Sequence, residues 1–235
     1  MSVIPPGAGE LVGDAPDRRV EILSDDPAIN ATLSRFGPGR AGADLHVHRR
    51  HSDLFYVLEG ELTVRLGIED RAATVPAGSV AMIPPGVVHG FRNATGGELR
   101  YLNFHAPGQR FTDYMRGLRD GRPFAYDQFD PPADGGRPAS EAAIGPPPVR
   151  IEALRLAERW GSHDEEVHAH EDQVESLYVL EGEAVLALGD GELRAPAGSW
   201  AQVAPGVAHA LRFPARTRYL SLFSPRAAPR RSPAA

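Results

Sequence analysis

An internal repeat constrains this chain more than any other feature of its sequence. The hexapeptide Tyr-Val-Leu-Glu-Gly-Glu occurs unchanged at residues 56–61 and 178–183, an offset of 122 residues. The tetrapeptide Pro-Ala-Gly-Ser occurs at residues 76–79 and 196–199, an offset of 120 residues. The two missing residues fall between these blocks, where we expect a turn that tolerates length changes. The 235 residues are therefore predicted to contain two copies of one fold.

Each copy has the pattern of short β-strands. Apolar segments rich in Val, Leu, Tyr and Phe occupy equivalent places at 54–66 and 177–188, at 80–83 and 200–203, and at 99–104 and 218–223. A Glu-Gly pair interrupts the first segment of each copy, and a Pro-Gly pair follows the second. Short strands separated by such turn residues favour a sandwich or a barrel.

The pattern changes between the two copies and again at the end of the chain. Phe111, Tyr114, Met115 and Leu118 are spaced i, i+3, i+4, i+7, which predicts a short helix over 111–119. The following residues are rich in Pro, Gly and Asp, as in a linker, and the last residues resemble a disordered tail. The predicted division is an N-terminal domain at 1–120, a linker at 121–149, a C-terminal domain at 150–223 and a tail at 224–235.

Six of the nine histidines occupy equivalent positions in the two copies and form two candidate metal sites. Each site combines a His-x-His pair, a later carboxylate and a later histidine: His46, His48, Asp53 and His89 in the first copy, and His168, His170, Glu175 and His209 in the second. On a regular strand the two histidines of a pair point to the same side, roughly 6–7 Å apart. Both can then bind one ion at about 2.1 Å. The alternative is that these histidines are polar filler in barrels without metal.

The other three histidines are not predicted to bind metal. We expect His51 to lie solvated in a turn and His163 to be exposed in an acidic loop, while His105 caps the last strand of the first copy.

Both copies resemble the cupin superfamily. The first cupin motif, His-x-His-x4-Glu-x6-Gly, is complete at 168–182, and at 46–60 it has Asp53 in place of Glu. The second motif, Gly-x5-Pro-x-Gly-x2-His-x3-Asn, is complete at 78–93. The second copy has Ala204 in place of its Pro and Phe213 in place of its Asn. The resemblance implies an all-β bicupin: two double-stranded jelly-roll barrels in tandem, joined by a short helix and a Pro/Gly-rich linker.

The resemblance also implies a cofactor and a chemistry. Three histidines per barrel would hold one divalent metal ion, and Fe, Mn, Ni, Co and Zn all suit such ligands. The pattern is similar to quercetin 2,3-dioxygenase-like proteins, in which a carboxylate takes a proton from a metal-bound flavonol. By that resemblance Glu175 and Asp53 are the catalytic candidates, as ligand or base.

Three functions remain open at this point. The first is a metal-dependent dioxygenase that acts on a small enolisable or aromatic, flavonol-like substrate. The second is a non-oxidative metal-dependent isomerase or lyase, and the third is a binding protein without turnover. Strand alternation nominates apolar pocket walls, although core packing alone would also explain these residues: Phe55, Val57, Phe91, Leu177, Val179, Leu211 and Phe213.

The two carboxylates differ in length. A glutamate reaches about 1.5 Å further than an aspartate, and metal–oxygen bonds tolerate only about 0.2 Å of error. Asp53 is therefore predicted to coordinate less directly than Glu175, which would leave the first site more open to substrate. Backbone adjustment that makes the two sites equivalent is the alternative.

Composition excludes several classes of protein. Without cysteine there are no disulfides or thiolate sites, and without lysine there is no Schiff-base chemistry. The net charge of −6 disfavours nucleic acid, and no long apolar run suits a membrane. We expect a cytoplasmic protein with a small-molecule partner, either a monomer with an internal pseudo-dimer or a homodimer. The Arg, Ala, Gly and Pro bias is typical of GC-rich bacterial genomes.

Overall fold

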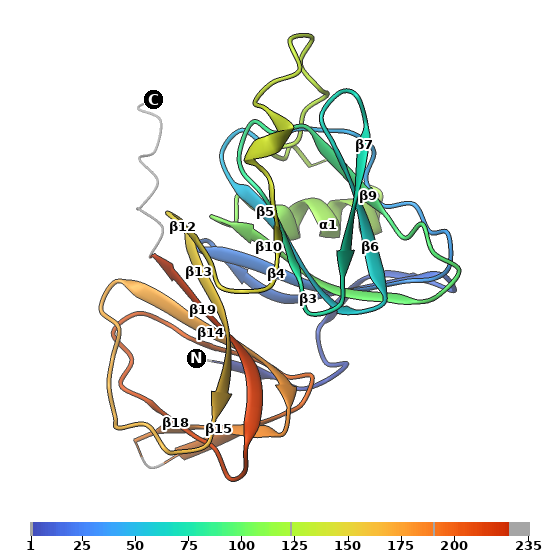
Figure 1. Cartoon of the computed structure of the whole chain (residues 1–235). Helices are drawn as coiled ribbons and strands as arrows, with labels where there is room; N and C mark the ends of the chain where they lie inside the picture. Colours follow the sequence, from blue (N-terminus) through green and yellow to red (C-terminus); the bar gives the residue numbers. More distant parts are fainter. Residues whose placement is uncertain (1, 123, 190, 226–235) are drawn as a thin grey trace.

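Two β-barrels follow one another along the chain (Figure 1). The structure, a computed structural model, describes residues 2–122, 124–189 and 191–225. Each barrel consists of one large and one small antiparallel sheet, as the repeat predicts. The predicted fold class, two tandem jelly-roll barrels with one short helix between them, is confirmed.

Ten strands of the described part of the chain form the first barrel. Its large sheet has the order β11 (Ala143–Gly145), β8 (Val80–Ile83), β5 (Ser52–Glu59), β10 (Leu99–Ala106), β4 (Ile29–Phe36), β3 (Arg18–Asp26) and β2 (Glu10–Ala15). Its small sheet has the order β7 (Arg71–Pro76), β6 (Glu61–Leu66) and β9 (His89–Arg92).

The second barrel repeats this plan, with nine strands within the residues that the structure describes. Its large sheet has the order β1 (Ser2–Ile4), β17 (Trp200–Val203), β14 (Gln173–Glu181), β19 (Thr217–Pro225), β13 (Leu154–Gly161) and β12 (Val149–Ile151). Its small sheet has the order β16 (Gly191–Pro196), β15 (Glu183–Leu188) and β18 (Ala210–Arg212).

The repeated Glu-Gly pair marks the point where the chain passes from the large sheet to the small one. Gly60 between β5 and β6 has φ +76°, and Gly182 between β14 and β15 has φ +81°. A Cβ at Gly60 would also lie 2.3 Å from the carbonyl oxygen of Glu98. Only glycine combines this backbone conformation with so close an approach, which explains why the pair interrupts both strands.

The two large sheets pack face to face and join the barrels. On β5, Phe55 and Val57 point into the first barrel, while Leu54 and Tyr56 point toward the second. The core between the barrels contains large side chains from both halves, among them Leu54, Phe104, Leu156, Tyr178, Trp200 and Leu222. The Tyr56 hydroxyl also donates a hydrogen bond to Glu158 Oε2 at 3.0 Å across this interface. The two barrels therefore pack as an internal pseudo-dimer, as predicted.

Three segments lie outside their predicted domains. Ser2–Ile4 pairs with β17 of the second barrel, although it precedes the first barrel in the chain. Within the predicted linker, Ala143–Gly145 pairs with β8 of the first barrel. Both segments satisfy the backbone groups of an exposed sheet edge, which strand patterns do not reveal. Ser224 and Pro225 belong to β19 instead of the predicted tail, and residues 226–235 lie outside the described residues.

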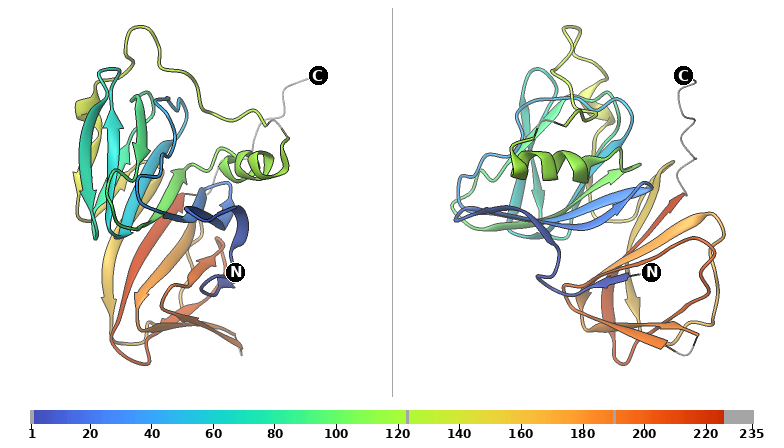
Figure 2. Two further views of the ribbon diagram at one scale, coloured as in Figure 1. Left: turned by 90° about the vertical axis from the view of Figure 1, so that its right-hand side faces the viewer. Right: turned by 180° about the vertical axis from the view of Figure 1, so that it is seen from behind.

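The helix α1 (Phe111–Asp120) forms where the apolar spacing predicts it, and it packs on β2 and β3. Met115 lies in a small core with Val12, Val20 and Ile22, so α1 covers one side of the first barrel (Figure 2). The 3-10 turn η1 (Ala139–Glu141) follows in the linker. Among the described residues the second barrel has no counterpart of α1.

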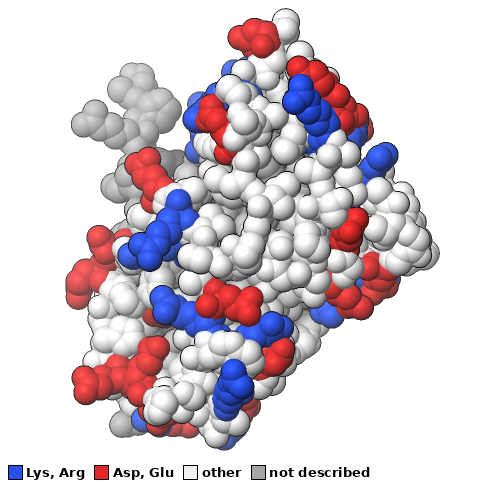
Figure 3. All heavy atoms as spheres, viewed as in Figure 1, with Lys and Arg blue, Asp and Glu red and all other residues white. Residues whose placement is uncertain are grey.

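Acidic and basic side chains are interspersed on the face shown in Figure 3. Within the described residues, no helix has the length and apolar character that crossing a membrane requires.

Candidate metal centres

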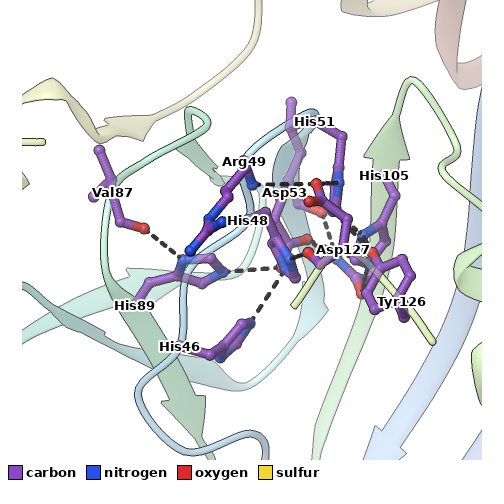
Figure 4. Close-up of polar contacts among 12 residues, drawn as sticks. His46, His48, Arg49, His51, Asp53, Val87, His89, His105, Tyr126 and Asp127 are labelled. Atoms are coloured by element: carbon purple, nitrogen blue, oxygen red, sulfur yellow. Dashed lines mark hydrogen bonds and ion pairs between the residues drawn. The ribbon is translucent and has the colours of Figure 1, made fainter. Parts of the chain in front are cut away.

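Four side chains converge inside the first barrel, as the sequence predicts. His46 and His48 lie between β4 and β5, Asp53 lies on β5 and His89 begins β9. Figure 4 shows the imidazoles of His46, His48 and His89 turned toward one another, with Asp53 beside them. His46 Nε2 lies 3.2 Å from His48 Nε2, and Asp53 Oδ2 lies 3.3 Å from His89 Nε2. All four side chains are buried.

The His-x-His pair does not lie on a regular strand. His46 forms an isolated bridge with His89, and the next residue, Val47, forms one with Phe129 of the linker. The backbone hydrogen bonds between His46 and His89 measure 2.8 and 2.9 Å. The segment is nevertheless extended, so the side-chain alternation holds and both rings point to one side. The linker thus pairs with the backbone of the His-x-His segment, a contact that the sequence pattern did not indicate.

The hydrogen bonds of the rings show that a cation fits among them. His46 Nδ1 donates to the carbonyl of Asp44 at 2.7 Å, and His48 Nδ1 donates to the carbonyl of Asp127 at 2.5 Å. Because a carbonyl only accepts, each Nδ1 carries the hydrogen and each Nε2 presents a lone pair. Two lone pairs that face each other at 3.2 Å repel unless a cation lies between them. Such outer hydrogen bonds are typical of metal-binding histidines.

The second barrel contains the equivalent group. Glu175 Oε2 on β14 lies 2.7 Å from His209 Nε2, 3.1 Å from His170 Nε2 and 4.0 Å from His168 Nε2. His168 and His209 donate Nδ1 to the carbonyls of Glu166 and Val207, as the first-site rings donate to theirs. His170 Nε2 is buried without a hydrogen-bond partner. An unsatisfied buried nitrogen directed at a carboxylate is a feature that a bound ion would explain.

The two sites differ in their access to solvent. The side chains of His168 and His170 are 34% and 29% exposed, whereas His46 and His48 of the first site are buried. The cover over the first site includes α1 and the linker, which the second barrel does not share among its described residues. Beneath this cover lies a cavity of about 470 Å³, lined by His46, His48 and Asp53.

Electrostatics favour a charged Asp53 carboxylate and a neutral His46 imidazole in the first site. Burial, with the neighbouring rings of His89 and His48, lowers the pKa of His46 to about 3. Burial works to raise the pKa of Asp53, but the imidazoles of His105, His48 and His89 hold it well below its usual range. Neutral imidazole and ionised carboxylate are the forms that bind metal. Asn103 on β10 donates a short hydrogen bond to Asp53 Oδ1, which orients the carboxylate.

His51 and His105 are both more deeply enclosed than the sequence predicts. His51 is only 1% exposed, so the prediction of a solvated turn residue is wrong. His105 lies one residue before the end of β10, close to the strand end where it was predicted, and it is buried; burial holds its pKa well below the usual value. Tyr126 and Asp127 of the linker complete this cluster, which lies beside the first metal site in Figure 4. His163 is exposed, as predicted.

The predicted pocket walls occupy two environments. Phe91 lines the cavity of the first barrel. Phe55 and Val57 lie in the core of that barrel, and Leu177, Val179, Leu211 and Phe213 lie in the core of the second.

Sequence comparison places these sites in a known family. The Cupin domain family matches residues 32–105 and 159–223, which together cover more than half of the chain. The chain belongs to the cupin family. Each match contains a complete three-histidine, one-carboxylate group, so this is a metal-dependent cupin with one such group in each barrel. No curated protein sequence matches the chain.

Solved structures share the two-barrel fold. A protein from Pseudomonas aeruginosa described as glyoxylate-induced has 19% identity and a TM-score of 0.67, with 99% of this chain and 91% of that chain covered. A single-substitution variant of the oxalate decarboxylase of Bacillus subtilis has 14% identity and a TM-score of 0.62, with 96% and 78% covered. The Escherichia coli protein Ylba has 16% identity and a TM-score of 0.65, with 97% and 92% covered. At these identities the likeness shows the fold alone.

Proposed function

We propose that this cupin is a metal-dependent enzyme that acts on a small organic acid, and that the first barrel holds its active site. The observation that carries the proposal is the cavity of about 470 Å³, which is lined by ligands of the first site and also by Arg18 and Arg40. Pockets of this size suit a single small molecule. A substrate in this cavity would lie between the metal ligands and the two guanidinium groups.

The two arginines favour an anionic substrate. Arg18 at the start of β3 forms no ion pair with the described residues, and it is partly buried. Arg40 binds Asp17 at 3.0 Å, but its Nε–H is buried without a hydrogen-bond partner. Unused guanidinium donors in a recess bind carboxylates through charge-assisted hydrogen bonds. A carboxylate directed toward Arg18 would leave the rest of an organic acid facing the metal ligands.

The residues of the first site then have separate roles. A divalent ion, when bound, supplies a Lewis acid that polarises a substrate oxygen. His46, His48 and His89 would hold it through Nε2, and their carbonyl partners fix the ring orientations. Asp53 would be the fourth ligand or the base that takes a proton from the substrate, with Asn103 holding its other oxygen. In the second barrel Glu175 has the same two candidate roles.

The names of the structural neighbours agree with this substrate class. Oxalate decarboxylase is named for a small dicarboxylic acid, and the Pseudomonas protein for induction by a small oxo acid. We therefore favour a lyase or isomerase reaction on an organic acid. A dioxygenase acting on an aromatic or enolisable substrate is the second candidate, favoured by Phe91, Phe111 and Tyr114, whose rings also line the cavity.

Turnover with and without oxygen tests the proposal. The full chain, loaded in turn with Mn²⁺, Fe²⁺, Co²⁺, Ni²⁺ and Zn²⁺, would be incubated with oxalate, glyoxylate, other short oxo and hydroxy acids, and the flavonol quercetin. We expect an organic acid to be converted, with products followed by nuclear magnetic resonance. Conversion of quercetin with oxygen uptake would establish the dioxygenase instead. Binding of acids without conversion would show a binding protein and contradict the proposal.

Arg18 provides the matched control. Arg18→Met should raise the KM for the acid at least tenfold, which corresponds to about 1.4 kcal/mol. Arg150→Met, which removes an exposed arginine on β12, should leave the KM unchanged. An unchanged KM in Arg18→Met would rule out carboxylate recognition by this residue.

A further inference from the structure

A cluster of two buried histidines and a partly buried tyrosine beside the first metal site is not used by the proposed function. His51 precedes β5, His105 lies near the end of β10, and Tyr126 comes from the linker. Figure 4 shows the three side chains directed toward one another. Tyr126 Oη lies 2.8 Å from His51 Nε2 and 2.7 Å from His105 Nδ1, and these two nitrogens are 3.0 Å apart. Three donor atoms thus form a small triangle in the interior.

The outer hydrogen bond of His51 shows which of its nitrogens carries a hydrogen. His51 Nδ1 lies 3.0 Å from Asp127 Oδ2, which also accepts the backbone N–H groups of Arg49 and Arg50. A carboxylate that receives these donors is ionised and accepts the His51 hydrogen. The His51 hydrogen is therefore on Nδ1, and Nε2 presents a lone pair to the triangle.

The same reasoning applies to His105. Asn103 donates through Nδ2 to Asp53 and to the carbonyl of Leu54, so its Oδ1 is the atom that faces His105. His105 Nε2 lies 3.0 Å from that oxygen and must donate to it. His105 Nδ1 consequently presents a second lone pair to the triangle. The Tyr126 hydroxyl has one hydrogen and can satisfy only one of the two nitrogens.

A metal ion bound at the triangle would accept the lone pairs of both nitrogens, which the single hydroxyl hydrogen cannot satisfy together. Ligands at about 2.1 Å from one ion lie about 3.0 Å apart in an octahedral arrangement and about 3.4 Å apart in a tetrahedral one. The three distances of 2.7, 2.8 and 3.0 Å are close to the octahedral value. Asp127 and Asn103 also bind the outer nitrogens of the two histidines, as partners of metal-binding histidines do.

We propose that His51, His105 and Tyr126 form an additional binding site for a divalent transition-metal ion in the first barrel. Two imidazoles and a phenolate suit Zn²⁺, Cu²⁺, Ni²⁺ or Co²⁺ better than Mg²⁺ or Ca²⁺. Binding releases the Tyr126 hydroxyl proton to solvent, and the oxygen then binds the ion. This site goes beyond the proposed function, which uses other ligands.

The new site adjoins the first site. The ligand nitrogens of His48, His51 and His105 all lie within 4.8 Å of one another. Asn103 connects the two groups, because it donates to Asp53 and accepts from His105. The first barrel would therefore hold two neighbouring ions, whereas the second would hold one.

The second barrel supplies matched substitutions. His105 pairs with Asp53 across β10 and β5, and Phe223 pairs with Glu175 at the same register across β19 and β14. Two residues before the carboxylate, the first barrel has His51 and the second has Gln173. The variant His51→Gln, His105→Phe therefore replaces both ligands with side chains that the fold already accepts.

Metal stoichiometry tests the proposal. The full chain would be loaded with Zn²⁺, dialysed against metal-free buffer, and measured for metal per chain and circular dichroism. We expect three equivalents in the wild type and two in the His51→Gln, His105→Phe variant. His163→Gln, which removes an exposed histidine, should retain three. Two equivalents in the wild type, or three in the double variant, would overturn the additional site.

Tyr126→Phe gives a second readout should the double variant not fold. Phenolate bound to Cu²⁺ absorbs visible light through charge transfer, so the Cu²⁺-loaded wild type should show such a band and Tyr126→Phe should not. A band that persists in Tyr126→Phe, or that never forms, would overturn the assignment of Tyr126. Loss of the third equivalent alone leaves the three-histidine sites loaded, so this result is distinguishable from failure of the proposed function.

Discussion

Asn103 offers a direct test of how the first site is organised. Its amide donates to Asp53 Oδ1 and accepts from His105 Nε2, and the residue is buried. The residue at the same register in the second barrel is Ser221, because Asn103 pairs with Phe55 and Ser221 pairs with Leu177. Asn103→Ser therefore removes the amide and introduces the residue that the other barrel uses.

The expected loss follows from two contacts. Removing the hydrogen-bond partner of a metal ligand typically weakens metal binding 10- to 100-fold, about 1.4–2.8 kcal/mol. The buried Nε2–H of His105 also loses its acceptor, which costs about 1–3 kcal/mol of the free energy of unfolding. We expect both effects in Asn103→Ser. Only a small change is expected in Ser221→Ala, whose hydroxyl forms no hydrogen bond to Glu175 in the described structure.

Calorimetric titration with Co²⁺ measures the first effect. A background of His168→Ala and His170→Ala removes the second-barrel ligands, so the titration reports on the first barrel, where binding at His46, His48 and His89 is fitted separately from binding at His51, His105 and Tyr126. Urea unfolding of the metal-free protein measures the second effect. A Co²⁺ affinity in Asn103→Ser within twofold of its background would refute the conclusion that Asn103 orients Asp53.

Three further predictions concern the carboxylates, pH and the interface between the barrels. Asp53→Glu should raise metal affinity at the first site, because Asp53 Oδ2 lies 3.3 Å from His89 Nε2, whereas Glu175 Oε2 lies 2.7 Å from His209 Nε2. Chelator competition measures this affinity, and an unchanged value would favour equivalent sites. The pKa of His46 is lowered to about 3, so the unfolded chain binds more protons as pH falls from about 6.5 toward 3. Between about pH 6.5 and pH 3, the free energy of unfolding of the metal-free protein should therefore fall by up to about 1.4 kcal/mol for each unit that the pH is lowered. Urea titrations measure this pH dependence, and His46→Gln should make it less steep. Trp200→Ala should lower the free energy of unfolding, measured with urea, by about 3–5 kcal/mol, because Trp200 is 0% exposed between the barrels. Trp160→Ala, at a 50% exposed position, should lower it by less than about 1 kcal/mol. Equal losses in the two variants would contradict the shared core.

Much of the fold could be predicted from the sequence because the two copies of the repeat show the same pattern of strands and turns. The Glu-Gly pairs predicted turns, and Gly60 and Gly182 do have the positive φ of turn glycines. The eight predicted metal-site residues form two groups. The two histidines of each pair share one side because alternation in an extended segment depends only on local geometry. This holds for His46 and His48 even though they lie on no regular strand.

The rest depends on contacts between distant segments. Tyr126 and Asp127 meet His51 across 75 or more residues, and a Pro/Gly-rich linker gives no periodic signal of such a contact. The position of His51 two residues before Asp53 pointed to a turn, but the linker covers that turn and buries the ring. Ser2–Ile4 likewise crosses to the second barrel, where it pairs with a sheet edge that its own sequence does not specify.

Anomalous diffraction from crystals of the metal-loaded protein, collected at the absorption edge of the bound metal, tests the central claim most directly. We expect each barrel to show a peak about 2.1 Å from the Nε2 atoms of its three histidines: His46, His48 and His89 in the first barrel, and His168, His170 and His209 in the second. The additional site at His51, His105 and Tyr126 would give a separate peak in the first barrel. A carboxylate oxygen of Asp53 or Glu175 should face the respective peak. Crystals of the loaded protein that show no peak among His46, His48 and His89 would contradict the assignment of the first barrel as a metal site.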